Sequence, residues 1–150
     1  MEASKLAIAF LLGALTTLAW STQAHTGGEH AAVGTVTQVG KAAKRAVPSG
    51  KASIEILARG KNAFLGRLEM AGEGKVPEHR DATEEYIHIL EGTGTLYMED
   101  EPHALKPGST VFMPAGAKVR FENGPKPLVA LQVFAGPEPS AKYESWKVVR

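Results

Sequence analysis

The sequence predicts an all-β domain, a barrel or sandwich of short antiparallel strands, and three observations support this. Short segments that alternate apolar and polar residues follow one another from residue 53 to residue 134. Turn residues, mainly Gly, Pro and Asn, separate these segments at short intervals. No stretch of this region keeps the 3.6-residue period of a helix. Each strand therefore buries one face, because alternate side chains of a strand point to the same side.

Eight strands are expected, in an order set by this alternation. They cover residues 54–59, 64–70, 85–90, 95–98, 103–105, 110–113, 118–122 and 128–134. Along residues 85–90, Glu85, Ile87 and Ile89 share one face, and Tyr86, His88 and Leu90 take the other. Residues 33–39 are expected to pair as a further short strand.

Four regions make up the expected domain organisation. Residues 1–24 are interpreted as a signal peptide, because Lys5 precedes an apolar run at 6–15 and Thr22-Gln-Ala24 approximates a cleavage site. An uncleaved membrane anchor is the alternative interpretation. A flexible arm at 25–51, a barrel at 52–136 and a C-terminal extension at 137–150 would follow. The mature protein would then be periplasmic or secreted, with no membrane attachment after cleavage.

The C-terminal extension carries two aromatic residues, Tyr143 and Trp146. We expect it to pack over the barrel or across a dimer, with a short helix at 140–146. A lid over the mouth of the barrel is the functional alternative.

Composition excludes several kinds of function. The formal net charge is +1, which gives no sign of a nucleic-acid partner. The chain has no cysteine, so disulfides, thiol catalysis and cysteine-based zinc sites are excluded. Stability must come from a hydrophobic core, with help from a dimer interface or a bound metal.

Two motifs resemble those of the cupin family. His79, Asp81, Glu85 and Gly92 follow the family's first motif, G-x5-H-x-H-x3-4-E-x6-G, with Asp81 in place of the second histidine. The leading glycine is out of register, since Glu73 stands at its position. The second motif, G-x5-P-x-G-x2-H-x3-N, is matched by Gly108, Pro114, Gly116 and Asn123, but Val119 replaces its histidine. This resemblance implies a single-domain jelly-roll barrel, and single-domain cupins resemble one another in forming dimers through sheet edges. We therefore expect a homodimer.

The resemblance also implies a site inside the barrel. Cupin metal centres use three histidines and one glutamate, and this chain keeps His79 and Glu85 directly. Asp81 is an acceptable replacement because a carboxylate can ligate a metal, whereas Val119 has no lone pair. His79, Asp81 and Glu85 are thus the predicted ligands of a weakly held divalent metal (Mn, Fe or Zn). The alternative is a hydrogen-bonded network of the same residues without metal.

Three functions remain open from the sequence. The first is a small-molecule binding module, which the loss of a ligand at Val119 favours. The second is a metal-dependent enzyme of the dioxygenase, isomerase or decarboxylase type. The third is a non-catalytic structural domain. Catalysis itself is left undecided, since one fold supports many functions.

Overall fold

The computed structural model describes residues 34–136 and 141–149. The predicted signal peptide at 1–24 and the arm up to residue 33 lie outside the described residues, as do residues 137–140. Among the described residues, no helix has the length and hydrophobicity needed to cross a membrane.

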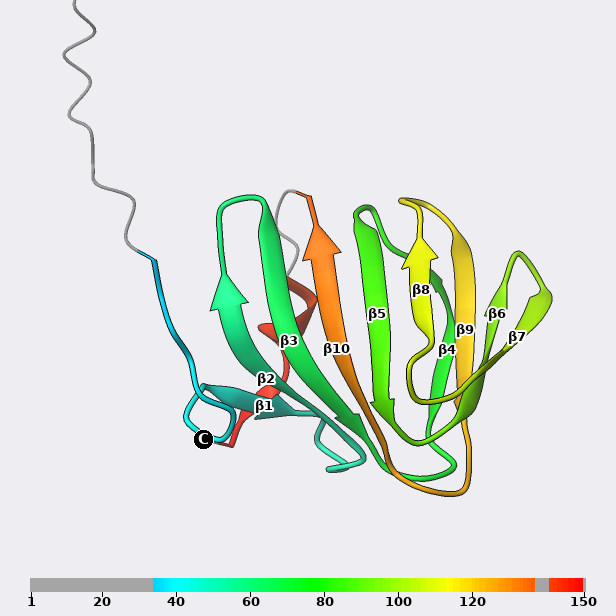
Figure 1. The fold of residues 1–150 in the computed structure, drawn as a ribbon, viewed down its shortest axis with the longest axis horizontal. Coiled ribbons are helices and arrows are strands. Elements are labelled where there is room, and N and C mark those ends of the chain that lie inside the picture. The colour runs from blue at the N-terminus through cyan, green and yellow to red at the C-terminus, as the bar shows by residue number, and fades with distance from the viewer. Residues whose placement is uncertain (1–33, 137–140, 150) are drawn as a thin grey trace, which may run out of the picture. The chain divides into compact units, whose positions relative to one another are not determined.

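Two antiparallel sheets make up the fold (Figure 1). The seven-stranded sheet has the order β11-β1-β2-β3-β10-β5-β8, and the four-stranded sheet has the order β4-β9-β6-β7. The strands of the larger sheet are β1 (Lys44–Ala46), β2 (Ala52–Arg59), β3 (Ala63–Met70), β5 (Glu84–Glu91), β8 (Thr110–Met113), β10 (Leu128–Ala135) and β11 (Lys147–Val148). Those of the smaller sheet are β4 (Lys75–Arg80), β6 (Gly94–Met98), β7 (Glu101–Leu105) and β9 (Lys118–Asn123).

The eight predicted strands are all present, which confirms the all-β prediction. Three further strands, β1, β4 and β11, were not among the eight predicted. The expected strand at 33–39 is wrong, because residues 34–39 adopt no strand. The tail forms a single 3-10 turn, η1 (Ala141–Tyr143), where a short helix was predicted.

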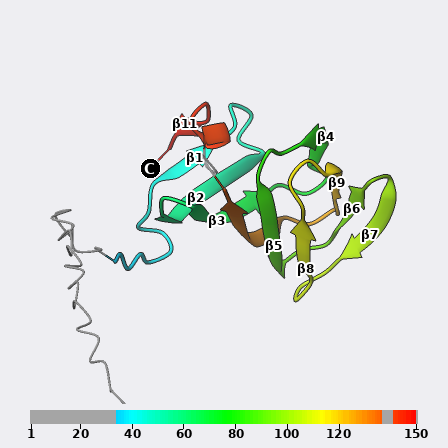
Figure 2. The same ribbon diagram turned by 90° about the horizontal axis from the view of Figure 1, so that it is seen from above.

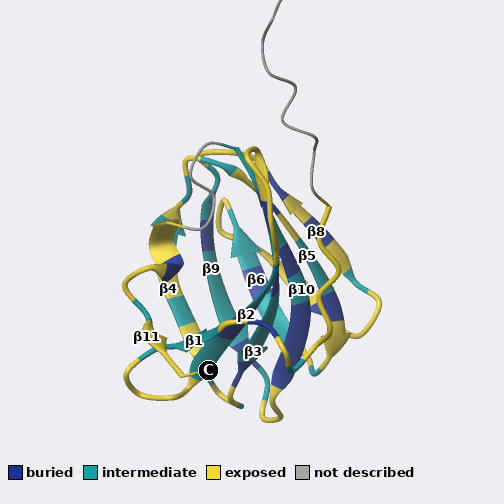
Figure 3. Ribbon diagram, turned by 90° about the vertical axis from the view of Figure 1, so that its left-hand side faces the viewer, coloured by how far each residue is buried: buried dark blue, intermediate teal, exposed yellow. Residues whose placement is uncertain are grey.

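Alternation along β5 and β10 sets which side chains enter the barrel. Glu85 and Ile89 are buried, while Tyr86 and Leu90 are exposed, as predicted. On β10 the inward positions include a polar residue, Gln132, which is only 5% exposed. Buried residues recur along β5, β8 and β10 (Figure 3).

Two hydrophobic clusters stabilise the fold. The larger lies between the sheets and comprises Met70, Ile89, Leu96, Leu105, Val111, Met113, Val119, Leu128 and Ala130. The smaller consists of Ile54, Phe64, Phe134 and Tyr143, with Trp146 packed against it. Residues 141–148, the C-terminal segment, thus cover part of the larger sheet, and Figure 2 shows this segment beside β1 and β2.

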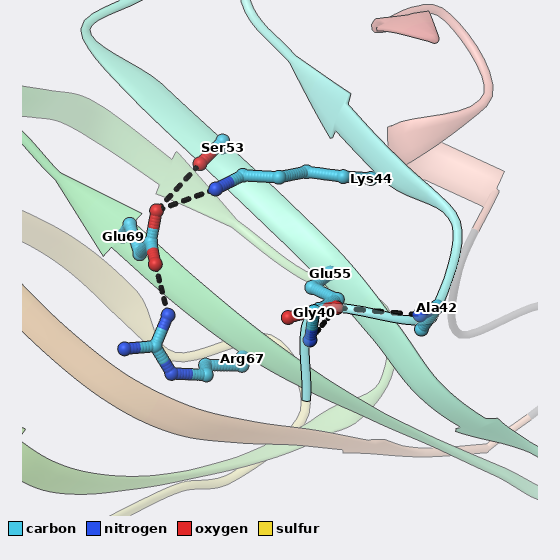
Figure 4. A network of polar contacts seen from close by, with 7 residues as sticks. All are labelled: Gly40, Ala42, Lys44, Ser53, Glu55, Arg67 and Glu69. Atoms are coloured by element: carbon cyan, nitrogen blue, oxygen red, sulfur yellow. Dashed lines mark hydrogen bonds and ion pairs between the residues drawn. The ribbon is translucent and has the colours of Figure 1, made fainter. Parts of the chain in front are cut away.

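A polar network ties residues 40–46 to β2 and β3 (Figure 4). The buried Glu55 carboxylate accepts hydrogen bonds from the backbone N–H groups of Gly40 and Ala42, at 2.5 and 3.3 Å. Glu69 accepts a 2.7 Å bond from Lys44 and another from Arg67. The Lys44 hydrogen bond is the main reason why the pKa of Glu69 lies below its ordinary value. This part of the predicted arm is therefore held on the sheet.

Candidate functional site

A cavity of about 450 Å³ lies inside the barrel, between the two sheets. Most of its wall is apolar and comes from both sheets. These residues are Val47, Ala52, Leu68, Met70, Val76, Ile87, Ile89, Leu96, Leu105, Val111, Met113, Val119, Phe121 and Leu128. Such a cavity is large enough to enclose a small organic molecule.

Several polar residues also line this cavity, including Ser49, Lys51, Lys75 and Arg120. Five others are bonded to one another or to Asp81, and they come from four different elements. His79 comes from β4, Glu85 from β5, Gln132 from β10, and Lys142 and Tyr143 from η1. The sheet pairing explains part of this grouping. Glu85 pairs with Phe134 across β5 and β10, two residues beyond the inward-facing Gln132.

His79 and Val119 are opposite one another in the pairing of β4 with β9. Both residues line the cavity, and Val119 is only 5% exposed. Val119 thus points inward, as the cupin resemblance implies for the histidine that it replaces. It contributes apolar surface there and no ligand atom.

Two basic side chains lie beside the Asp81 carboxylate. Its Oδ2 atom lies 2.7 Å from Lys142 Nζ and 3.4 Å from His79 Nε2. The bond from His79, together with Lys142, lowers the pKa of the Asp81 carboxyl to about 2. The other ring nitrogen of His79, Nδ1, lies 2.9 Å from the carbonyl oxygen of Pro77. Because both ring nitrogens face acceptors, the pKa of His79 is raised, mainly by the hydrogen bond to Asp81.

Glu85 belongs to a second, more deeply buried chain of hydrogen bonds. Gln132 donates from Nε2 to the Glu85 carboxylate, and its Oε1 accepts from the Tyr143 hydroxyl. Burial is the largest cause of a raised pKa for Glu85, and burial also raises the pKa of Tyr143. Gln132 orients both partners, because it donates to one and accepts from the other.

The structure therefore separates the three predicted ligands into two groups. His79 and Asp81 contact each other, whereas Glu85 is bonded to Gln132. Within the described residues, no set of three or more His, Cys, Asp or Glu side chains is arranged to hold a metal ion. The arrangement matches the hydrogen-bonded alternative more closely, and the three residues as they lie do not fit a shared metal.

Sequence reasoning missed Gln132, Lys142 and Tyr143 as site residues. Gln132 carried a signal, because it is a polar residue at an inward position of an otherwise apolar strand. No sequence signal marked Lys142 and Tyr143 as site residues, apart from the alternative that the C-terminal extension is a lid. Their contacts with Asp81 and β10 arise only in the folded chain. The tail does pack over the barrel, as predicted, and it forms part of the cavity wall.

Comparison with known proteins identifies the fold family. A model of the cupin domain matches residues 66–134, which run from β3 to β10. The chain belongs to the cupin superfamily. The cupin match contains both sequence motifs but ends before Lys142 and Tyr143. A search of curated proteins found no match to the sequence.

Solved cupin-like structures share this fold at low sequence identity. KdgF from Halomonas sp. is 12% identical with a TM-score of 0.65, and the alignment covers 69% of this chain and 94% of that one. A predicted oxalate decarboxylase from Thermotoga maritima is 20% identical with a TM-score of 0.60, covering 68% and 99%. The polyketide cyclase RemF from Streptomyces resistomycificus is 25% identical with a TM-score of 0.53, covering 57% and 65%. At these identities the first two similarities establish the cupin fold alone, and we draw no activity from any of the three.

Proposed function

We propose that this cupin binds a small, largely apolar molecule in its barrel, with one polar group of the ligand placed among His79, Glu85, Gln132 and Tyr143. The observation that carries the proposal is the cavity of about 450 Å³, whose wall is mostly apolar and includes these four polar side chains. Burial of apolar ligand surface supplies affinity, and a few fixed polar groups supply orientation.

The chemistry of the wall narrows the class of ligand. A sugar would bring hydroxyl groups against Leu, Ile, Val and Met side chains, where they would lose their hydrogen bonds to water. An aromatic or branched aliphatic compound with one carboxyl, hydroxyl or carbonyl group matches the cavity better. Tyr143 and Trp146 add flat aromatic surface, with ring centroids 4.9 Å apart.

Fluorescence titration tests this proposal directly, because Trp146 lines the cavity. We expect aromatic and aliphatic acids, phenols and ketones to change the emission of Trp146 saturably, and sugars to leave it unchanged. Val119→Phe places bulk in the cavity and should weaken binding at least about tenfold, or about 1.4 kcal/mol.

Leu90→Phe is the matched control, since Leu90 is 40% exposed on the outer face of β5. It should bind as the unmodified protein does. Saturable binding of sugars, with no response to any apolar compound, would contradict the proposed class of ligand.

A weakly held divalent metal at His79, Asp81 and Glu85 stays a prediction from the sequence. We give it no part in ligand binding, because the three side chains do not converge as ligands. The metal-dependent enzyme and the non-catalytic structural domain also stay alternatives predicted from the sequence. Metal analysis of protein purified without a histidine tag tests the metal-dependent enzyme, because that function needs a bound metal.

Assembly as a homodimer is part of the same proposal. Tyr86 on β5 and Phe112 on β8 point outward, 38% and 47% exposed, with ring centroids 5.0 Å apart. β8 is a terminal strand of the larger sheet, so a second copy can cover this apolar surface. We expect a dimer by light scattering at micromolar concentration and a monomer for Phe112→Asp. A monomer before substitution would refute this.

Export stays a prediction as well. The apolar run at 6–15 and the site ending at Ala24 support a mature chain that begins near His25, in the periplasm or outside the cell. The intact mass of the native protein distinguishes a cleaved chain from an uncleaved one.

A further inference from the structure

Lys142 brings an ammonium group to the polar end of the cavity from outside the matched cupin domain, which ends at residue 134. Its Nζ atom lies 2.7 Å from Asp81 Oδ2 and 4.3 Å from the centre of the Phe134 ring. The Lys142 side chain is 36% exposed. The cation is thus partly withdrawn from water and faces a carboxylate and an aromatic ring together, two environments that favour positive charge.

The position of this ammonium group is fixed by its neighbour in the chain. Tyr143 is 3% exposed, donates its hydroxyl to Gln132, and packs against Phe64 and Phe134. Because the backbone at residue 143 is held in this way, Lys142 reaches Asp81 with less loss of conformational freedom than a lysine on a free tail.

The ammonium group of Lys142 offsets negative charge at this end of the barrel. Asp81 and Glu85 place two carboxyl groups at this end of the barrel, and Glu85 is 5% exposed. Charged groups withdrawn from water are stable only when they are paired. Lys142 supplies a positive charge, and both Lys142 and His79 lie beside the Oδ2 atom of Asp81.

The same geometry opposes a metal ion. Four positions would hold the metal in the family pattern, namely 79, 81, 85 and 119, but Val119 offers no lone pair. Asp81 is already bonded to Lys142. A divalent cation at Asp81 would have to displace the ammonium group and would be repelled by it at short range.

We propose that Lys142 is the resident cation of this barrel and that it keeps divalent metal ions away from Asp81 and His79. The negative charge of Asp81 is then balanced by the Lys142 ammonium group of the same chain. This inference does not depend on the identity of the organic ligand, so its test is separate from the fluorescence titration.

The test measures Zn²⁺ affinity by competition with a chromophoric chelator, using full-length protein without a tag. The starting variant is Val119→His, which returns a nitrogen ligand to the cavity. Adding Lys142→Ala should tighten Zn²⁺ binding at least about tenfold, by analogy with the 10–100-fold effects of groups around metal ligands. Adding Lys142→Arg keeps the charge and should leave the affinity at that of Val119→His alone.

Lys147→Ala is the matched control, because Lys147 is an exposed lysine on β11 of the same segment. It should not change Zn²⁺ affinity in the Val119→His background. Lys142→Gln provides a second neutral variant if the alanine variant does not fold. Equal affinity with and without Lys142, including no measurable binding in both, overturns the proposal, and so does tighter binding with Lys142→Arg.

Discussion

Phe134→Ala is expected to lower the free energy of unfolding by about 3–5 kcal/mol, the usual range for removing a buried phenylalanine. Phe134 is fully buried and lies in the smaller cluster with Phe64 and Tyr143. Its ring also underlies the Lys142 ammonium group. The substitution thus leaves a cavity and loosens the contact of the C-terminal segment with the barrel. Urea denaturation followed by circular dichroism measures the loss.

Phe134→Leu is the graded control for this experiment. It keeps most of the buried volume, and swaps that conserve volume cost under about 1.5 kcal/mol. If the alanine variant lost no more stability than the leucine variant, the ring would not be part of a packed core.

Gly92→Ala is expected to cost about 2–5 kcal/mol, the combined range of left-handed backbone strain and overpacking. Gly92 has φ +83°, a conformation that side chains disfavour. An added Cβ would lie 2.5 Å from the carbonyl oxygen of Pro127 and 2.8 Å from the Cα of Leu128. Both are backbone atoms at the start of β10, so the collision cannot be relieved by rotating a side chain. Thermal unfolding of purified protein measures the cost.

Gly116→Ala separates the cost of left-handed backbone strain from the cost of the steric collision. Gly116 has φ +80°, nearly the same as Gly92, but a Cβ there would meet open space. It should therefore show the strain alone, about 1–2 kcal/mol. Equal losses at Gly92 and Gly116 would show that the contact with Pro127 has no energetic weight.

Much of the fold could be predicted because burial on one face leaves a period-two pattern. Residues 85–90 show this alternation, and β5 follows it, whereas residues 128–134 form an apolar run interrupted only by Gln132 and give the largely buried strand β10. β4 could not be predicted in this way, since all of its residues are exposed or half-buried and no buried apolar face results. β1 and β11 are three and two residues long, too short for any period to be read.

Only those site residues that lie within one local motif could be predicted from the sequence. His79, Asp81 and Glu85 lie within seven residues, so their proximity follows from the chain itself. Their hydrogen-bond partners do not: Gln132 is 47 residues from Glu85, and Lys142 is 61 residues from Asp81. These partners divide the triplet into two groups, and no spacing rule within the motif contains that information.

Pairing of β1 with β11 has a consequence for the order in which this barrel is completed. Arg45 pairs with Val148, so this contact closes a loop of about a hundred residues, and distant contacts of this kind form slowly. Lys142, Tyr143 and Trp146 of this segment also leave the ribosome after every other residue that lines the cavity. A nascent chain can therefore assemble β2, β3, β5 and β10 while Asp81 still lacks its ammonium partner. The wall of the cavity is therefore completed only after β2, β3, β5 and β10 have been synthesised.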